Sequence, residues 1–215
     1  MKYKTEWIEY PDIEEHCKRI GAPPTEKKPD GRDHYTLPVI YDPNTKTVVA
    51  DTETIAKYLE KTYPGTPRLF PEGTHAFQAA FSQFLVPTTV ATFYIIVDRI
   101  CSLLNPRSVE YFRRTREEAF GKKLEELASE GDWKKLESEL DSLKKCLDAN
   151  GEGKDLLLMG DKITWADIEI ASWLRWMKMV VGEESEDWKR LTTLHGGRWA
   201  KIGEQFARYE YIDLP

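Results

Sequence analysis

The chain changes texture near residue 70, and this change limits the folds that it can adopt. Before that point, short runs of β-type residues alternate with clusters of proline and glycine, whereas from residue 75 onward apolar residues recur at three- and four-residue steps. A period of two is typical of a half-buried strand, and a period near 3.6 is typical of a helix that packs on one face. The sequence therefore predicts a small mixed α/β region followed by a larger all-helical region.

Composition supports a folded protein and excludes several classes of partner. A chain of 215 residues with 40% hydrophobic content can bury one sizeable core or two modest ones. Its formal net charge of −6 argues against a general affinity for nucleic acids or anionic membranes, because both favour clustered lysine and arginine. We find no apolar run close to the ~20 residues that span a bilayer and no secretion signal at the start. We therefore expect a soluble, cytoplasmic protein.

The cysteines and histidines lie far apart in the sequence, with neither CxxC nor HExxH spacing. This spacing predicts neither a disulfide framework nor a metal site. The cysteines are Cys17, Cys101 and Cys146. We expect three free thiols in a reducing compartment, with Cys101 packed as a small apolar residue.

The first region begins with a predicted strand and a short helix. Bulky and polar side chains alternate over residues 3–10, which is the pattern of a half-buried strand, and Pro11 ends it. A helix is expected over residues 13–20. Residues 21–31 are charged and rich in turn-forming residues, which indicates a solvated loop.

A hairpin and a second helix are predicted next. Residues 36–41 and 47–50 are β-type runs separated by an Asp-Pro-Asn turn, so we expect them to pair. Asp51 and Thr52 are good residues for a helix start. We expect this helix to end where a Tyr-Pro-Gly sequence follows it.

Three long helices are predicted in the second region. The first begins at His75 and continues through Ile100, with a bend expected at Pro87. Another is expected over residues 109–127. The third has a narrow apolar seam on a highly charged helix, which suggests antiparallel pairing with its neighbours. The seam residues are Leu136, Leu140, Leu143 and Leu147.

A capping box is predicted at the start of a further helix. Thr164 can accept a hydrogen bond from a first-turn amide while the Asp167 carboxylate reaches back to the Thr164 amide. Ile163 and Ile168 occupy the positions of a hydrophobic staple, which would fix the angle at which the chain enters the helix.

Three motifs in this order resemble those of the cytosolic glutathione transferases. Leu37-Pro38-Val39 resembles the family's strand-opening cis-proline motif, and Asp51-Thr52 resembles its motif for the γ-glutamyl group of glutathione. The segment from Thr164 to Asp167 resembles the family's buried capping box. The series spans nearly the whole chain.

The resemblance implies an incomplete thioredoxin-like α/β domain followed by an all-helical domain. The implied boundaries are 1–65 for the glutathione-binding domain, 66–74 for the linker and 75–215 for the helical domain. Residues 5–14, 21–25 and 34–40 resemble the fungal class called FuA, which is related to bacterial β-etherases. That class is associated with wood-degrading fungi and binds glutathione together with plant polyphenols.

The resemblance also implies a glutathione site. A cis bond before Pro38 would turn the backbone of Val39 outward, so that its N–H and C=O pair with the cysteinyl part of glutathione. The Thr52 hydroxyl and the helix N-terminus would receive the γ-glutamyl carboxylate, and Asp51 the ammonium group. His34 is placed near the ligand. An ordinary trans proline, simple helix capping and a solvated loop histidine are the alternatives.

An aromatic stripe on the first long helix suggests a pocket for a second ligand. Phe81, Phe84, Phe93 and Tyr94 can form an apolar wall against which a flat polyphenol would stack. The alternative is that the stripe belongs to the hydrophobic core.

In the family, a further strand and helix precede the strand predicted at 3–10, and the loop between them carries a catalytic Ser, Tyr or Cys. The sequence begins after that position, so we assign no catalytic residue and expect weak or absent catalysis. We also expect residues 3–10 and 36–41 to lack the strand between them. Direct pairing of the two, a strand from a partner chain, or a loosened first domain are the possible compensations.

Three functions remain open on the sequence alone. The first is a transferase that uses glutathione as co-substrate in detoxification. The second is a non-catalytic, ligandin-type protein that binds polyphenols. The third is a protein-interaction module on the same fold. A homodimer is expected in each case.

Overall fold

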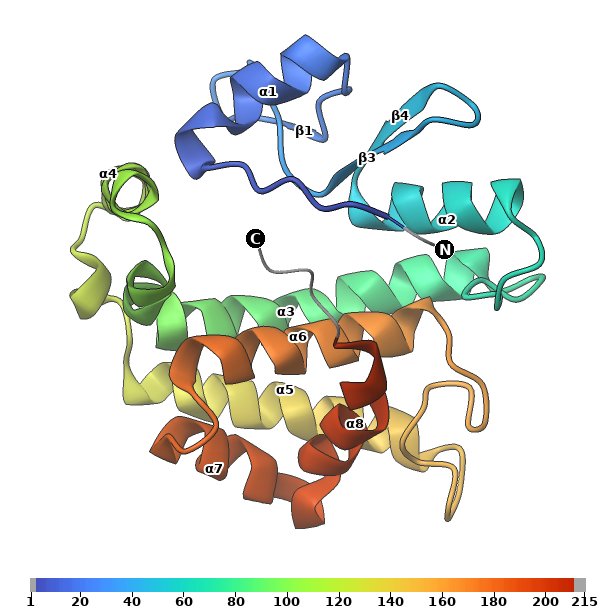
Figure 1. The fold of residues 1–215 in the computed structure, drawn as a ribbon. Helices are drawn as coiled ribbons and strands as arrows, with labels where there is room; N and C mark the ends of the chain where they lie inside the picture. Colours follow the sequence, from blue (N-terminus) through green and yellow to red (C-terminus); the bar gives the residue numbers. More distant parts are fainter. Residues whose placement is uncertain (1–2, 211–215) are drawn as a thin grey trace. The chain divides into compact units, whose positions relative to one another are not determined.

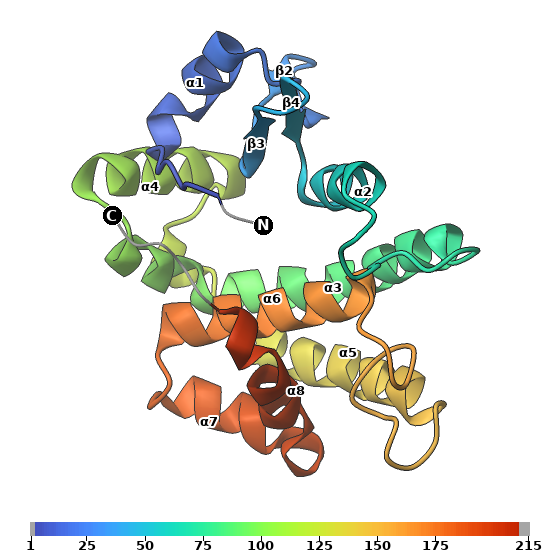
Figure 2. The same ribbon diagram turned by 45° about the vertical axis from the view of Figure 1, so that its right-hand side comes forward.

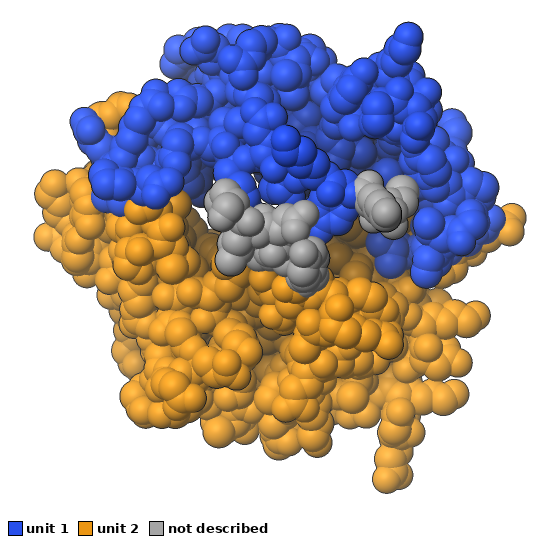
Figure 3. Space-filling view, viewed as in Figure 1, with its two compact units in different colours: residues 1–69, 105–112, 213–215 blue, residues 70–104, 113–212 orange. Residues whose placement is uncertain are grey.

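The computed structural model describes residues 3–210 and divides them into two compact units (Figures 1 and 3). The first unit comprises residues 3–69 and 105–112, and the second comprises residues 70–104 and 113–210. Residues 105–112 thus group with the first unit although they follow the first long helix in sequence. The boundaries derived from the sequence stay a prediction.

Besides residues 105–112, the first unit contains two complete α-helices and two antiparallel ribbons (Figure 2). The helices are α1 (Ile13–Ile20) and α2 (Thr52–Thr62). In the ribbons, β1 (Glu26–Lys27) pairs with β2 (Asp33–His34), and β3 (Val39–Asp42) pairs with β4 (Thr47–Ala50). The predicted hairpin and both predicted helices are confirmed. The β1–β2 ribbon lies in and just after the stretch that was expected to be a loop.

The predicted strand over residues 3–10 is wrong. Residues 3–9 have no regular structure, and a short 3-10 helix, η1 (Tyr10–Asp12), begins at Tyr10. Tyr3 is 65% exposed and Trp7 56% exposed, so the bulky side chains of the alternating pattern do not cover a core. A strand needs a neighbour for its backbone groups, and no described segment pairs with this one.

Direct pairing of residues 3–10 with the β3 segment is therefore excluded for the described residues. Within that part of the chain, β3 pairs with β4 alone. The observed β3 also starts later than predicted, at Val39, because Pro38 has no N–H to contribute to a ladder.

The start of α4 (Pro106–Phe120) belongs to the first unit because it is bonded to η1 and the residue before it. Ser108 donates its hydroxyl to the Glu9 carboxylate and accepts from the Tyr10 amide at 3.0 Å. The Arg107 guanidinium donates two bonds to Asp12, at 2.5 and 2.6 Å. The hydrogen bonds from Ser108 and Asn105 lower the pKa of Glu9. These polar contacts hold the N-terminal segment against α4.

The second unit is a helical bundle centred on α3 (Figure 1). Its helices are α3 (His75–Ile100), the second half of α4, α5 (Glu130–Asp148), α6 (Trp165–Val181), α7 (Glu186–Thr193) and α8 (Arg198–Phe206). α3 packs against both α5 and α6. The seam of α5 is confirmed as core, since its four leucines are 0% exposed. They are Leu136, Leu140, Leu143 and Leu147.

Two helix expectations in this unit need comment. α3 is continuous through Pro87, as predicted, and the expected bend there stays a prediction. The helix predicted over 109–127 instead ends at Phe120, because Gly121 follows with φ of 66°, a left-handed conformation that stops the helix. Leu124 lies beyond it in a separate 3-10 turn, η3 (Leu124–Glu126), and is fully buried.

Residues His75–Leu103 form a helix that is long and apolar enough to cross a membrane by length and composition. The sequence alone did not indicate a possible membrane span here, because single polar residues interrupt the apolar run of this helix. Length and composition do not separate a membrane span from the central helix of a bundle. In the structure 44% of its apolar window is buried, and α5 and α6 pack against the same helix, as in a protein core.

The predicted capping box at the start of α6 is confirmed. The Asp167 carboxylate accepts from the Thr164 amide at 2.7 Å, from the Thr164 hydroxyl at 2.8 Å and from the Leu158 amide at 2.6 Å. Thr164 and Asp167 are 0% and 2% exposed. The box therefore also attaches the loop before α6 to the bundle.

Candidate functional site

The register of the β3–β4 hairpin brings together three of the predicted site residues. Val39, the first residue of β3, pairs with Ala50, the last residue of β4. α2 begins two residues later, at Thr52. The start of β3 and the N-terminus of α2 therefore lie side by side, with Asp51 between the two elements.

The peptide bond that precedes Pro38 is cis, as the resemblance of Leu37-Pro38-Val39 to the family's motif implies. Pro38 is exposed, and Val39 is half-buried. The backbone edge of Val39 that does not face β4 has no strand neighbour among the described residues. An extended peptide can pair with such an edge.

Asp51 has an uncommon backbone conformation, with φ of 75° and ψ of 131°. It is the N-cap of α2, and its Oδ2 atom accepts from the Thr54 amide at 3.1 Å and from the Thr54 hydroxyl at 2.8 Å. Positive φ in a non-glycine residue is concentrated at functional sites. Thr52, the first helical residue, is exposed. The first N–H groups of α2 have no intrahelical acceptor, so this helix end can bind an anion.

His34 belongs to the other ribbon of the first unit. It is in β2, where its Nδ1 atom is 3.5 Å from a carboxylate oxygen of Glu26 and its carbonyl accepts from the Thr25 amide at 2.9 Å. No strand pairing or hydrogen bond among the described residues connects His34 with Val39, Asp51 or Thr52.

A buried carboxylate that the sequence reading missed fixes the hairpin to α2. Asp42, at the end of β3, is 6% exposed and accepts at 2.7 Å from the hydroxyls of both Tyr58 and Tyr63. The bond from Tyr58, followed by that from Tyr63, lowers the pKa of Asp42 to about 2. These two bonds attach the second half of α2 and the residue after it to the end of β3, while Asp51 caps the start of the helix.

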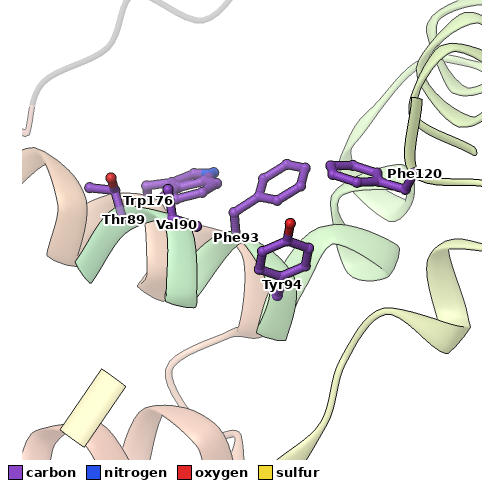
Figure 4. Close-up of a pocket in the computed structure, with 6 residues that line it drawn as sticks. All are labelled: Thr89, Val90, Phe93, Tyr94, Phe120 and Trp176. Atoms are coloured by element: carbon purple, nitrogen blue, oxygen red, sulfur yellow. The ribbon is translucent and has the colours of Figure 1, made fainter. Parts of the chain in front are cut away.

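The second unit contains an open pocket of about 430 Å³ (Figure 4). Its walls come from α3, from the last residue of α4 and from α6. The lining residues are Thr89, Val90, Phe93, Tyr94, Phe120 and Trp176. Phe93 and Tyr94 are two of the four aromatic residues that the sequence suggested for a second ligand.

The other two suggested residues do not line this pocket. Phe81 is 6% exposed and contributes to the core, and its ring lies 5.8 Å from that of Phe84. Phe120 and Trp176 were not suggested, because they come from helices distant in sequence and no local pattern relates them to α3. Their contribution becomes visible only when the bundle is assembled.

Three rings form the aromatic part of the pocket. Phe93, Tyr94 and Phe120 contact one another with centroid separations of 5.7 to 6.0 Å, in tilted and edge-on arrangements. No lining residue is charged. Such a surface is suited to a flat, uncharged aromatic molecule.

Two of the three cysteines, Cys17 and Cys101, are at least partly buried. Burial raises the pKa of the Cys17 and Cys101 thiols, so both are held as neutral thiols at pH 7. Neither is a good nucleophile.

A family model and the similar known proteins agree on one family, the glutathione S-transferases. Residues 76–209 match a family model described as glutathione S-transferase, C-terminal domain. Among curated proteins, the glutathione S-transferase-like protein ustS of Aspergillus flavus is 30% identical, over 94% of this chain and 76% of that protein.

Several solved structures are similar over nearly the whole chain. Glutathione transferase GSTFuA3 from Phanerochaete chrysosporium is 64% identical with a TM-score of 0.98, covering 100% of this chain and 86% of that one. The glutathione S-transferase CsGST63524 of Ceriporiopsis subvermispora, solved in complex with glutathione, is 45% identical with a TM-score of 0.94. That match covers 99% of this chain and 86% of the other.

Proposed function

This chain belongs to the glutathione S-transferase family, and from that premise we propose that its first unit binds glutathione and its second unit binds an aromatic compound. The fold class expected from the sequence is confirmed by the match to GSTFuA3, and so is the resemblance to the fungal FuA class. The observation that carries the proposal is the Val39–Ala50 pairing, which places Val39 beside Asp51 and Thr52.

Glutathione offers chemical groups that suit these three residues. Its extended peptide can pair with the backbone of Val39 as an added strand. Its γ-glutamyl carboxylate suits the N-terminus of α2, where the exposed Thr52 hydroxyl is a further donor. Its ammonium group suits Asp51, whose Oδ1 atom accepts no hydrogen bond from a described residue. The glutathione bound to the C. subvermispora neighbour supports the proposal.

We propose that catalysis by these residues is weak. A glutathione transferase works largely by stabilising the glutathione thiolate, which requires a donor placed at the sulfur. Val39, Asp51 and Thr52 are assigned to the peptide and to the γ-glutamyl end, and His34 has no link to them. Detoxifying transfer is therefore expected to be slow with the described residues.

A non-catalytic role as a polyphenol-binding protein is the second candidate. The pocket around Phe93, Tyr94 and Phe120 favours it, because these rings can stack on a flat ligand without glutathione.

We also propose a cytoplasmic homodimer. Phe77 and Phe84, two turns apart on α3 and 49% and 37% exposed, are the residues that we assign to its interface.

Calorimetric titration with glutathione tests the main proposal. The wild-type protein is expected to bind it, and Thr52→Ala to bind it about tenfold or more weakly, because a hydrogen bond to a charged group is lost. Thr52→Ser keeps the hydroxyl and is expected to retain affinity. Equal affinities of the wild type and Thr52→Ala for glutathione would show that the Thr52 hydroxyl does not bind it.

A thermal-shift series separates the candidate functions. Stabilisation by glutathione supports the transferase-type site, and stabilisation by a flavonoid alone supports the polyphenol-binding role. Stabilisation by neither would favour a protein-interaction module.

A further inference from the structure

Tyr94 supplies the hydroxyl of the aromatic pocket that is open to a ligand. Three lining residues carry a polar side-chain atom: Thr89, Tyr94 and Trp176. The Thr89 hydroxyl donates at 2.8 Å to the Val86 carbonyl within α3. The Tyr94 hydroxyl and the Trp176 indole N–H make no hydrogen bond with a described residue, and of these two groups only the Tyr94 hydroxyl can both donate and accept.

The ring of Tyr94 is held in place by its neighbours. Its centroid lies 6.0 Å from that of Phe93 and 5.7 Å from that of Phe120, both at steep interplanar angles of 74° and 61°. Figure 4 shows its oxygen turned toward these two rings rather than away from them. The hydroxyl is therefore oriented before a ligand arrives, which lowers the entropic cost of a hydrogen bond to it.

The chemistry of the lining limits the ligand. A charged group would lose its hydration against Val90, Phe93 and Phe120 without gaining a partner, because no lining residue is charged. A half-buried tyrosine hydroxyl, by contrast, gains from a hydrogen-bonding partner. A pocket of about 430 Å³ falls in the usual size range of small-molecule sites.

We propose that Tyr94 is the specificity-determining residue of this pocket, and that it selects uncharged planar aromatic compounds bearing an oxygen that hydrogen-bonds to its hydroxyl. This inference rests on the proposed aromatic-binding function of the second unit. Apolar aromatic compounds of the same shape bind by stacking alone and gain nothing from the Tyr94 hydroxyl.

A matched pair of probes tests the role of the hydroxyl. 1-Naphthol and 1-methylnaphthalene have nearly the same shape and are both uncharged at pH 7, but only the first can hydrogen-bond. Their affinities are measured by calorimetry for the wild type, for Tyr94→Phe and for Tyr209→Phe. Tyr209 is 57% exposed and does not line the pocket, so its variant removes a hydroxyl elsewhere in the same unit.

Tyr94→Phe is expected to weaken 1-naphthol binding by about two- to tenfold, the effect of one neutral hydrogen bond, and to leave 1-methylnaphthalene binding unchanged. Tyr209→Phe is expected to change neither affinity. Equal effects of Tyr94→Phe on both probes, or no effect on 1-naphthol, would overturn the inference while the aromatic-binding function stands. Failure of the wild type to bind either probe would instead overturn the aromatic-binding function, and the inference with it.

Discussion

The Thr164 hydroxyl lies 2.8 Å from the Asp167 carboxylate in a capping box that is almost completely buried. The chain contains a second capping box with the same pattern, at the start of α5, where the Ser129 hydroxyl donates to Asp132 at 2.6 Å. Ser129 is exposed. The two boxes therefore allow the effect of burial on the same motif to be measured within one protein.

Asp167→Asn is expected to lower the free energy of unfolding by about 2–3 kcal/mol, because an amide nitrogen would face the Thr164 or Leu158 N–H donor in a dry site. Asp132→Asn is the matched control. It is expected to lower the free energy of unfolding by about 0.5–1 kcal/mol, since water can replace the lost acceptor. Urea titration followed by far-UV circular dichroism measures both. Equal losses would mean that burial of the α6 box does not matter.

The backbone at Asp51 predicts an unusual order of stability between two variants. Asp51→Gly loses the cap of α2 but is favoured at φ of 75°, whereas Asp51→Ala loses the cap and keeps the unfavourable conformation. We expect the glycine variant to be more stable than the alanine variant by about 1–2 kcal/mol. Both should bind glutathione more weakly, because the carboxylate is gone. An alanine variant as stable as the glycine variant would show that the backbone conformation at Asp51 is not strained.

The Asp42 carboxylate predicts a loss of stability in acid. Its pKa is lowered to about 2 in the folded protein by the Tyr58 and Tyr63 hydroxyls, and is about 3.9 in an unfolded chain. Because the folded value is the lower one, this stabilisation is fully present above about pH 4 and is lost as the pH falls toward 2. Tyr58→Phe should therefore be less stable than the wild type at pH 5, with a difference that shrinks by pH 2.

Melting temperatures recorded from pH 5 to pH 2 measure this effect. Tyr41→Phe is the control, because Tyr41 is on the same strand, β3, and is 60% exposed. Its melting temperature should follow that of the wild type throughout. A gap between the wild type and Tyr58→Phe that stays constant with pH would show that Asp42 does not titrate as described.

How much of the site could be predicted depends on how local each signal is. The α2 start at Asp51-Thr52 follows from a few adjacent residues, and the structure places it where the sequence predicts. The prediction of a strand at 3–10 is wrong because the alternation of bulky and polar side chains does not show whether a neighbouring strand is present. Asp42 was missed because its partners, Tyr58 and Tyr63, lie 16 and 21 residues away.

The aromatic residues of α3 show the same limit within one helix. Phe81 and Phe93 belong to one apolar pattern, yet the first is in the core and the second lines a pocket. The pattern is ambiguous because α3 is apolar on nearly all sides, with no single buried stripe. Only the positions of α5, α6 and the end of α4 decide which of its aromatic side chains remain accessible.

Phe120 and Phe81 should accordingly respond to truncation in opposite ways. Phe120→Ala removes a 37% exposed ring from the pocket wall, so it should cost about 1 kcal/mol of stability or less and weaken 1-naphthol binding by about tenfold. Phe81→Ala removes a buried ring, so it should cost about 3–5 kcal/mol, with unchanged affinity in the folded fraction. Urea titration and calorimetry on the two variants measure both quantities. If Phe81→Ala weakened binding more than Phe120→Ala, the pocket would extend along α3 toward Phe81 and the assignment of its walls would be wrong.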